Sequence, residues 1–319
     1  MSQLAERAPS GPTQPVPPPT NREKGTRLKD FLQALPWIGP ALALIFAIVF
    51  FPAGLMFYNS TRDISRAGVD RGSAGLEKYA ELFAMPALLP TLFRSIIWVV
   101  VVVAGTIVIS LFLAHFLNKA FPGRQLVRLA VVVPWAASVI MTTTVIYYGF
   151  EPGYGIFQKF FVDIGILDRG DFGFTKSMPT AFIVAILIAI FVSLPFTTYT
   201  LLAGTQSIGN DVIEAARIDG ASGRQTYFKV ILPQLKPAIA VSTIINIINV
   251  FNSFPILKLV TGSLPGFDGD TTTTLMFKLL QARQDSGMAS ALSVINFAIV
   301  IGVIAIYIKV VKPMKGVDE

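Results

Sequence analysis

The sequence contains no cysteine and a single histidine, and only 14% of its 319 residues are charged. The missing cysteines exclude disulfide bonds, thiolate metal sites and cysteine nucleophiles, and His115 alone cannot form a histidine cluster. A soluble protein usually carries about 25% charged residues. Because 53% of the residues are hydrophobic, the composition predicts a protein embedded in a membrane and disfavours a soluble enzyme.

Apolar residues gather in six runs, each close to the ~20 residues that a helix needs to cross about 30 Å of hydrocarbon. We predict an all-α membrane domain over residues 31–315. Its expected spans are residues 35–58, 92–117, 126–150, 179–204, 236–261 and 288–311. Prolines interrupt several runs, which membrane helices tolerate where neighbouring groups satisfy the freed carbonyls.

The two ends of the chain differ from this domain. Residues 1–27 contain six prolines and almost no large apolar residue. Such a segment cannot bury enough surface to offset the entropy of ordering, so residues 1–30 are predicted to be a disordered tail. Residues 316–319 form a short C-terminal tail.

Basic residues give the expected orientation. If the N-terminus is cytoplasmic, that side of the membrane holds 15 basic and 8 acidic residues, whereas the other side holds 11 of each. A basic excess on one side is the signature of cytoplasmic loops. We therefore expect both termini and the loop 205–235 in the cytoplasm, and we read the net charge of +7 as basic loops and not as a nucleic-acid-binding surface.

The opposite side carries three segments, of which residues 60–90 include an amphipathic stretch at 76–89 that is expected to lie along the membrane surface. Arg94 and Lys258 fall near the outer membrane boundary in this topology. Long basic side chains at that depth usually extend to the lipid headgroups, and this is the interpretation we favour for both.

The loop between the fourth and fifth spans, residues 205–235, is long and patterned. Asn210 or Asp211 can cap a short helix, and Gly220 can end it because glycine readily adopts positive φ. A second helix is expected at 222–232, with Pro233 stopping it. Long structured loops usually have a function.

The spacing within this loop resembles the permease loop of binding-protein-dependent ABC importers. The motif is Glu-Ala-Ala, three residues, Gly, nine residues, a branched apolar residue, any residue and Leu-Pro. It falls on Glu214, Ala215, Ala216, Gly220, Val230, Leu232 and Pro233. The string EAARIDGAS is similar to the carbohydrate-uptake branch, which includes permeases for maltose, trehalose and glycerol-3-phosphate.

The resemblance implies a type I importer permease fold in which the loop forms a coupling helix that docks on an ATPase. Residues implied in this contact are Glu214, Ala215, Ala216, Asp219, Gly220, Leu232 and Pro233. It also implies several partners: a second homologous permease, a dimeric ATPase, an extracytoplasmic solute-binding protein, membrane lipid and a sugar. The expected location is a bacterial or archaeal cytoplasmic membrane.

The same resemblance implies that this chain is not catalytic and carries no metal or cofactor. The sequence contains no G-x-x-x-x-G-K-[ST] phosphate loop. ATP and Mg²⁺ are therefore expected on the ATPase.

Polar residues in the fifth span suggest where substrate would bind. Asn246, Asn249 and Ser253 follow i, i+3, i+7 spacing and share one helix face. Asparagines in hydrocarbon must find partners, so this face is directed either at a water-filled cavity or at another helix. The stretch is similar to the substrate-contacting span of maltose permeases, which implies contacts from Asn246, Asn249, Val250 and Ser253. A predicted helix break at 192–196 similarly implies contacts from Ser193 and Phe196.

Two other functions stay open at this point. A secondary, ion-coupled transporter should place Asp or Glu within its spans, and the predicted span interiors contain none. An ABC permease for another solute, such as glycerol-3-phosphate, would share the coupling loop but should add cations to the cavity. In either ABC case the partner permease, and not this one, could carry the binding site.

Overall fold

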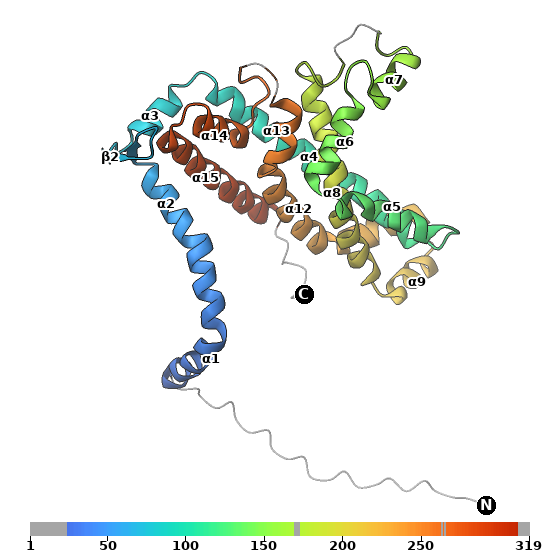
Figure 1. The fold of residues 1–319 in the computed structure, drawn as a ribbon. Helices are drawn as coiled ribbons and strands as arrows, with labels where there is room; N and C mark the ends of the chain where they lie inside the picture. The colour runs from blue at the N-terminus through green and yellow to red at the C-terminus, as the bar shows by residue number, and fades with distance from the viewer. Residues whose placement is uncertain (1–23, 169–172, 263, 265, 312–319) are drawn as a thin grey trace, which may run out of the picture. The chain divides into compact units, whose positions relative to one another are not determined.

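The computed structural model describes residues 24–168, 173–262, 264 and 266–311, and most of them are helical (Figure 1). This confirms the predicted all-α membrane class. The chain divides into two compact units, residues 1–55 and 56–319.

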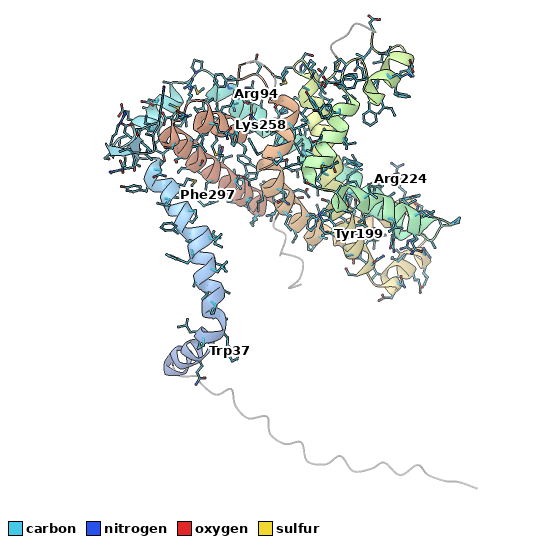
Figure 2. All side chains as sticks on the ribbon, viewed as in Figure 1. Trp37, Arg94, Tyr199, Arg224, Lys258 and Phe297 are labelled. Carbon is cyan, nitrogen blue, oxygen red and sulfur yellow. The ribbon has the colours of Figure 1, made fainter. Side chains whose placement is uncertain are left out.

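The first unit contains α1 (Lys24–Ile45), the π-helix η1 (Phe46–Phe50) and the start of α2 (Phe51–Asn59). Residues 24–30, predicted to belong to the disordered tail, are helical, whereas residues 1–23 and 312–319 lie outside the described residues. Large apolar side chains on these helices are exposed, including Trp37 at 86% (Figure 2). Such a surface suits a helix surrounded by lipid.

The second unit begins with a feature that the sequence analysis missed. Strands β1 (Arg62–Ile64) and β2 (Asp70–Ser73) form an antiparallel hairpin, and Arg62 pairs with Asp70 at 2.7 Å. Gly68, with φ of +79°, lies in the connecting turn. The amphipathic stretch at 76–89 is divided between α3 (Glu77–Phe83) and the start of α4 (Leu88–Asn118).

Four helical segments in the described part of the chain are long and apolar enough to cross a membrane: residues 33–59, α4, α8 (Thr180–Gln206) and α15 (Ser286–Val311). Two bent pairs raise the number to as many as six, in agreement with the predicted count. One pair is α5 (Arg124–Ala136) with α6 (Val139–Gly149), bent by 99°. The other joins residues 223–234 to α12 (Lys236–Phe251), bent by 63°.

The proline predictions need correction. Pro195 lies inside an uninterrupted α8, so the helix break predicted at 192–196 is absent. Pro233 does not stop a helix either, since it lies in α11 (Leu232–Gln234) and the chain bends at Leu235. A break does occur in the predicted span 236–261, where α12 ends at Phe251 and α13 (Phe254–Thr261) follows.

The main core of the second unit lies where α4 packs along α8 (Figure 1). Trp98 and Val102 from α4 meet Ala185 and Ile188 from α8, and Leu257 from α13 joins them. A second core holds α3, α14 (Thr272–Gln281) and α15 together through leucines. The remaining segment on this side, α7 (Ile156–Asp163), packs Phe157 and Phe161 against Phe150. These cores fix the helices that surround the site described next.

Candidate functional site

A cavity of about 380 Å³ lies where the α5–α6 break, α8 and the α12–α13 break come together. All six residues proposed as substrate contacts line it: Ser193, Phe196, Asn246, Asn249, Val250 and Ser253. The structure therefore gathers in one place residues from two helices that the sequence suggested separately. None of the lining residues in the described part of the chain carries a charge.

Within this group, the side-chain amide of Asn246 is hydrogen-bonded to other groups of the protein. It is 3% exposed, and its Nδ2 donates to Thr197 Oγ1 at 2.8 Å and to the Ser242 carbonyl at 2.8 Å. The first bond joins α12 to α8. Both Nδ2 hydrogens are thus used, and Asn246 acts as a helix–helix link at the cavity wall.

The side chains of Asn249 and Ser253 are available to a ligand. Asn249 is exposed and Ser253 half-buried, and among the described residues neither side chain makes a hydrogen bond. Phe196 lies opposite at 37% exposure. Free polar groups and an aromatic ring lining one cavity are the combination by which proteins bind hydroxylated, partly apolar solutes.

The third wall of the cavity was not predicted from the sequence. Trp135 and Val139 lie on either side of the break between α5 and α6, and both line the cavity. The sequence feature that points to this break is Pro134, which is buried in the last turn of α5. Proline in an apolar run marks a kink, but its direction is set by packing and cannot be read from the sequence.

The loop 205–235 has its own geometry. Helix α9 (Asn210–Ile218) begins after Gly209 without a side-chain cap, so the predicted caps Asn210 and Asp211 are wrong. It ends in a Schellman motif, because the Ala221 N–H bonds the Ala216 carbonyl at 3.0 Å and the Gly220 N–H bonds that of Arg217 at 3.0 Å. Gly220 has φ of +80°, as that motif requires.

A second helical stretch follows at once. Ser222 and Gln225 form a capping box at the start of α10 (Gly223–Thr226), which continues as the π-helix η2 (Tyr227–Ile231) and α11. Of the predicted coupling residues, Glu214, Ala215, Asp219 and Gly220 are exposed on or just after α9. Leu232 and Pro233 lie apart from them, on α11.

A hollow of about 820 Å³ separates α9 from the end of α4. Glu214 lines it together with Arg217 and Arg224, two cations that the spacing motif does not include. His115 also lines it, with its ring 4.4 Å from that of Tyr227. This contact makes His115 a packed residue.

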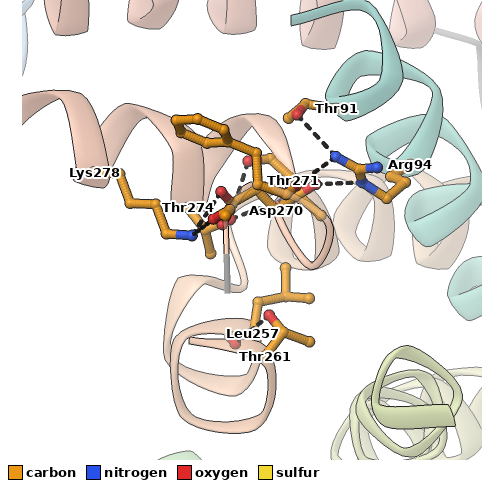
Figure 3. A network of polar contacts seen from close by, with 10 residues as sticks. Thr91, Arg94, Leu257, Thr261, Asp270, Thr271, Thr274 and Lys278 are labelled. Carbon is orange, nitrogen blue, oxygen red and sulfur yellow. Dashed lines mark hydrogen bonds and ion pairs between the residues drawn. The ribbon is translucent and has the colours of Figure 1, made fainter. Parts of the chain in front are cut away.

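Arg94 does not extend to lipid headgroups as predicted. Its guanidinium donates to the carbonyls of Asp270 at 2.9 Å and Phe267 at 2.7 Å, and to Thr91 Oγ1 at 3.2 Å (Figure 3). Lys258 places its Nζ 5.4 Å from the centre of the Phe277 ring. Arg94 is therefore a structural clamp between α4 and the segment before α14.

Comparison with known proteins identifies the family to which this chain belongs. Residues 106–311 match the family described as the binding-protein-dependent transport system inner membrane component. The chain belongs to this family. It is the membrane permease component of an ABC importer, a type of subunit that is not itself an enzyme because the ATPase is a separate chain.

Individual relatives agree. The permease is 34% identical to a probable ABC transporter permease protein of Brucella suis biovar 1 over 85% of this chain and 93% of the relative. It is 30% identical to the sulfoquinovosyl glycerol transport system permease protein of Agrobacterium fabrum over 89% of this chain and 92% of the relative. It is 28% identical to the trehalose/maltose transport system permease protein of Thermococcus litoralis over 85% and 90%.

A solved structure shows the same fold. A bacterial ABC transporter involved in the import of the acidic polysaccharide alginate contains a chain that superposes with a TM-score of 0.78, covering 91% of this permease and 99% of that chain at 18% identity. The type I importer fold predicted from the loop motif is thereby confirmed.

Proposed function

We propose that this permease carries an uncharged sugar, such as a di- or oligosaccharide, across the cytoplasmic membrane through the cavity lined by Asn249 and Ser253. The observation that carries the proposal is the chemistry of that cavity: free amide and hydroxyl groups beside aromatic rings, with no charge among its described lining residues. Its volume of about 380 Å³ falls within the roughly 300–1,000 Å³ usual for small-molecule sites.

A phosphorylated solute is the second candidate. A relative named as an sn-glycerol-3-phosphate transport system permease protein is 26% identical to this chain over 277 residues. A phosphate needs Arg, Lys or clustered N–H donors, and the cavity wall of this chain offers no cation among the described residues. The uncharged sugar is favoured, and it agrees with the substrates in the name of the trehalose/maltose relative.

Energy is proposed to enter at α9. A second permease of the same family and a dimeric ATPase, which holds ATP and Mg²⁺, complete the membrane complex, and an extracytoplasmic binding protein delivers the sugar. The related alginate transporter has been solved with its periplasmic protein. Closure of the ATPase would displace α9, whose exposed face includes Glu214 and Ile218, and the movement would pass along α11 into α12.

Orientation is the first part of this proposal to test. Both termini and α9 are placed in the cytoplasm, in a bacterial or archaeal cytoplasmic membrane, because the basic excess lies on that side. The chain has no cysteine of its own, so single cysteines report cleanly. In intact cells an impermeant thiol reagent should label Tyr154→Cys, which replaces a 74% exposed side chain, and leave Ser222→Cys unlabelled. Labelling of Ser222→Cys from outside would reverse the topology.

The substrate is tested by uptake of a panel of radiolabelled disaccharides, oligosaccharides and glycerol-3-phosphate in cells that contain the whole transporter. Asn249→Ala should raise the half-saturation concentration for one sugar several-fold, since a hydrogen bond contributes about 0.5–1.5 kcal/mol. Its thermal stability should not change. Asn246→Ala is the matched control, because it should lower stability by breaking the bond to Thr197.

Three results would refute the assignment. One is unchanged uptake by Asn249→Ala and Ser253→Ala, which would move the site to the partner permease. The second is a preference for glycerol-3-phosphate over every sugar. The third is uptake that persists when the ATPase is inactivated.

A further inference from the structure

The break between α12 and α13 leaves two backbone carbonyls without their usual helical donors. Phe251 O would normally accept from the N–H of residue 255, but that residue is Pro255, which has none. Val250 O would accept from Phe254, whose N–H instead bonds Asn252 O at 2.8 Å. Both carbonyls belong to buried residues. Phe251 O has no backbone donor among the described residues and needs another, whereas Val250 O keeps one bond from the Ser253 N–H at 3.1 Å and can accept a second.

Side chains from two other helices supply these donors. Trp98 Nε1 on α4 donates to Val250 O at 2.8 Å, and Thr273 Oγ1 on α14 donates to Phe251 O at 2.9 Å. Trp98 is 1% exposed and Thr273 is 8% exposed, so water does not compete for either bond. The break is therefore held open and in place from outside its own helix.

The position of these bonds matters for the cavity. Val250 and Ser253 line the cavity, and Asn249 precedes the first bonded carbonyl directly. A change in the angle of the break would move Asn249 and Ser253 with it. Trp98 and Thr273 do not line the cavity themselves, so they can act on it only through the backbone.

Helix α14 is itself fastened at its N-terminal end. Arg94 bonds the Asp270 carbonyl, and the Asp270 carboxylate pairs with Lys278 Nζ at 2.8 Å while being only 2% exposed (Figure 3). The Thr272 N–H adds a bond to Ser95 Oγ at 2.8 Å. Thr273 thus stands on a rigid support that lies on the proposed outer side of the membrane.

We propose that Trp98 and Thr273 are positioning residues for the cavity, and that α14 transmits displacements of the outer segment to the α12–α13 break through the Thr273–Phe251 bond. This inference rests on the proposed function for its meaning in transport. The geometric part of the inference is independent of that function. It states that the reach and reactivity of the side chain at position 253 depend on the hydroxyl of Thr273 and on the indole N–H of Trp98.

The test measures the reactivity of Ser253→Cys toward N-ethylmaleimide in host membranes that contain the complete transporter. Thr273→Val leaves Phe251 O unpaired and should loosen the break, which raises the labelling rate by about tenfold for a buried acceptor that loses its donor. Trp98→Phe keeps the ring, removes the N–H and should act in the same direction. Thr273→Ser restores a hydroxyl and should restore the original rate.

Thr205→Val is the matched control. Thr205 is also a buried threonine, at 4% exposure, but its hydroxyl bonds the Leu201 carbonyl of its own helix at 2.8 Å. It should leave the labelling of Ser253→Cys unchanged. Equal labelling in Thr273→Val, Trp98→Phe and Thr205→Val would overturn the inference, as would a Thr273→Ser variant that labels as fast as Thr273→Val.

The labelling experiment can succeed or fail independently of the proposed function. Labelling needs no sugar, so a permease that transports none of the sugars tested still reports whether Thr273 controls position 253. If sugar uptake is established, the positioning role predicts a second result. Thr273→Val should raise the half-saturation concentration more than it lowers the maximal rate, and Thr205→Val should alter neither. If Thr273→Val fails to insert, Trp98→Phe alone decides between the two outcomes.

Discussion

The α9 loop and the α12–α13 break are two interruptions of helical structure that are stabilised in opposite ways. The turn after α9 is closed by bonds between residues at most five positions apart, from Ala221 to Ala216 and from Gly220 to Arg217. The break has local bonds as well, such as that from the Ser253 N–H to Val250 O, but Val250 O and Phe251 O also accept from donors 152 and 22 positions away. A local device keeps its shape when it is displaced as a unit, whereas a break held from two other helices must follow them. This difference suits a segment that docks on a partner and a segment that forms a cavity wall.

The largest effect is expected in the local device, from a change of backbone preference alone. Gly220 has φ of +80° and open space around the position of a Cβ, so a substitution there meets strain but no clash. A left-handed residue with a Cβ costs about 1–2 kcal/mol, and more when it is β-branched. Gly220→Val should abolish transport and weaken copurification of the ATPase, while Gly220→Asn, which tolerates positive φ, should retain part of both.

Gly223 gives the matched control for this series. It lies three positions from the motif residue Gly220, has ordinary φ and likewise has open space around it. Gly223→Ala should transport normally. A membrane-inserted Gly220→Val protein with wild-type transport would show that the turn is not needed for coupling, and the contrast between the two regions would lose its functional meaning.

A smaller but still large effect is expected for the clamp at Arg94. Arg94→Met leaves the carbonyl of the buried Asp270 without a donor among the described residues, at about 1–3 kcal/mol for an unsatisfied buried group. The Phe267 carbonyl loses one of two donors and keeps the Asp270 N–H at 3.2 Å. Arg94→Lys keeps the charge but loses the planar fork that reaches two carbonyls at once. Both variants should melt earlier in detergent, with Arg94→Met the less stable. If Arg94 served lipid headgroups, lysine would replace it without loss.

The α9 loop and the α12–α13 break also show which structural features can be predicted from the sequence. Helix α9, the positive φ of Gly220 and the helical stretch that follows it could be predicted, because the residues that determine them lie close together in the chain. The six cavity residues were found through helix periodicity and family resemblance, but their division into a committed Asn246 and an available Asn249 was not. That division depends on Thr197, which α8 brings to Asn246 from 49 positions away.

The prolines show the same limit from another side. Pro134 and Pro255 lie beside breaks, whereas Pro195 lies within an uninterrupted α8. In each case the proline removes one donor, and neighbouring groups can satisfy the freed carbonyl. Such neighbours are tertiary, so composition and spacing predict the number of spans and not which of them are broken. The short hairpin at 62–73 was also missed, although its Arg62–Asp70 ion pair joins residues only eight positions apart.

A moderate effect is expected where a single long-range bond is removed from the cavity wall. Thr197→Val takes away the acceptor for Asn246 Nδ2 and should cost about 1–2 kcal/mol. Thr205→Val, on the same helix, removes only an own-helix bond and should cost less. The difference between their melting temperatures in detergent isolates the α8–α12 link. Equal shifts in melting temperature would mean that Asn246 finds another acceptor. The break region would then be as independent of distant residues as the α9 loop.

The smallest effect is expected for an ion pair at the surface. Lys176 Nζ lies 2.8 Å from Glu151 Oε1 and 3.2 Å from Tyr147 Oη, and the hydrogen bond to Glu151 is the main reason that the pKa of Lys176 is raised. The lysine side chain is 34% exposed, so solvent screens the pair and its contribution should be about 0–1 kcal/mol.

The sign of its pH dependence follows from the raised pKa. The contribution is fully present below the ordinary lysine value of about 10.4 and is lost as the pH rises through the higher folded value. Lys176→Met should therefore melt slightly below the wild-type protein at pH 8, and the gap should close as the pH rises through the folded pKa of Lys176. To keep an unpaired carboxylate from adding its own cost, the comparison is repeated in a Glu151→Gln background, where the difference should shrink at every pH. A gap that widens with rising pH would show that Lys176 is stabilised by contacts other than its charge.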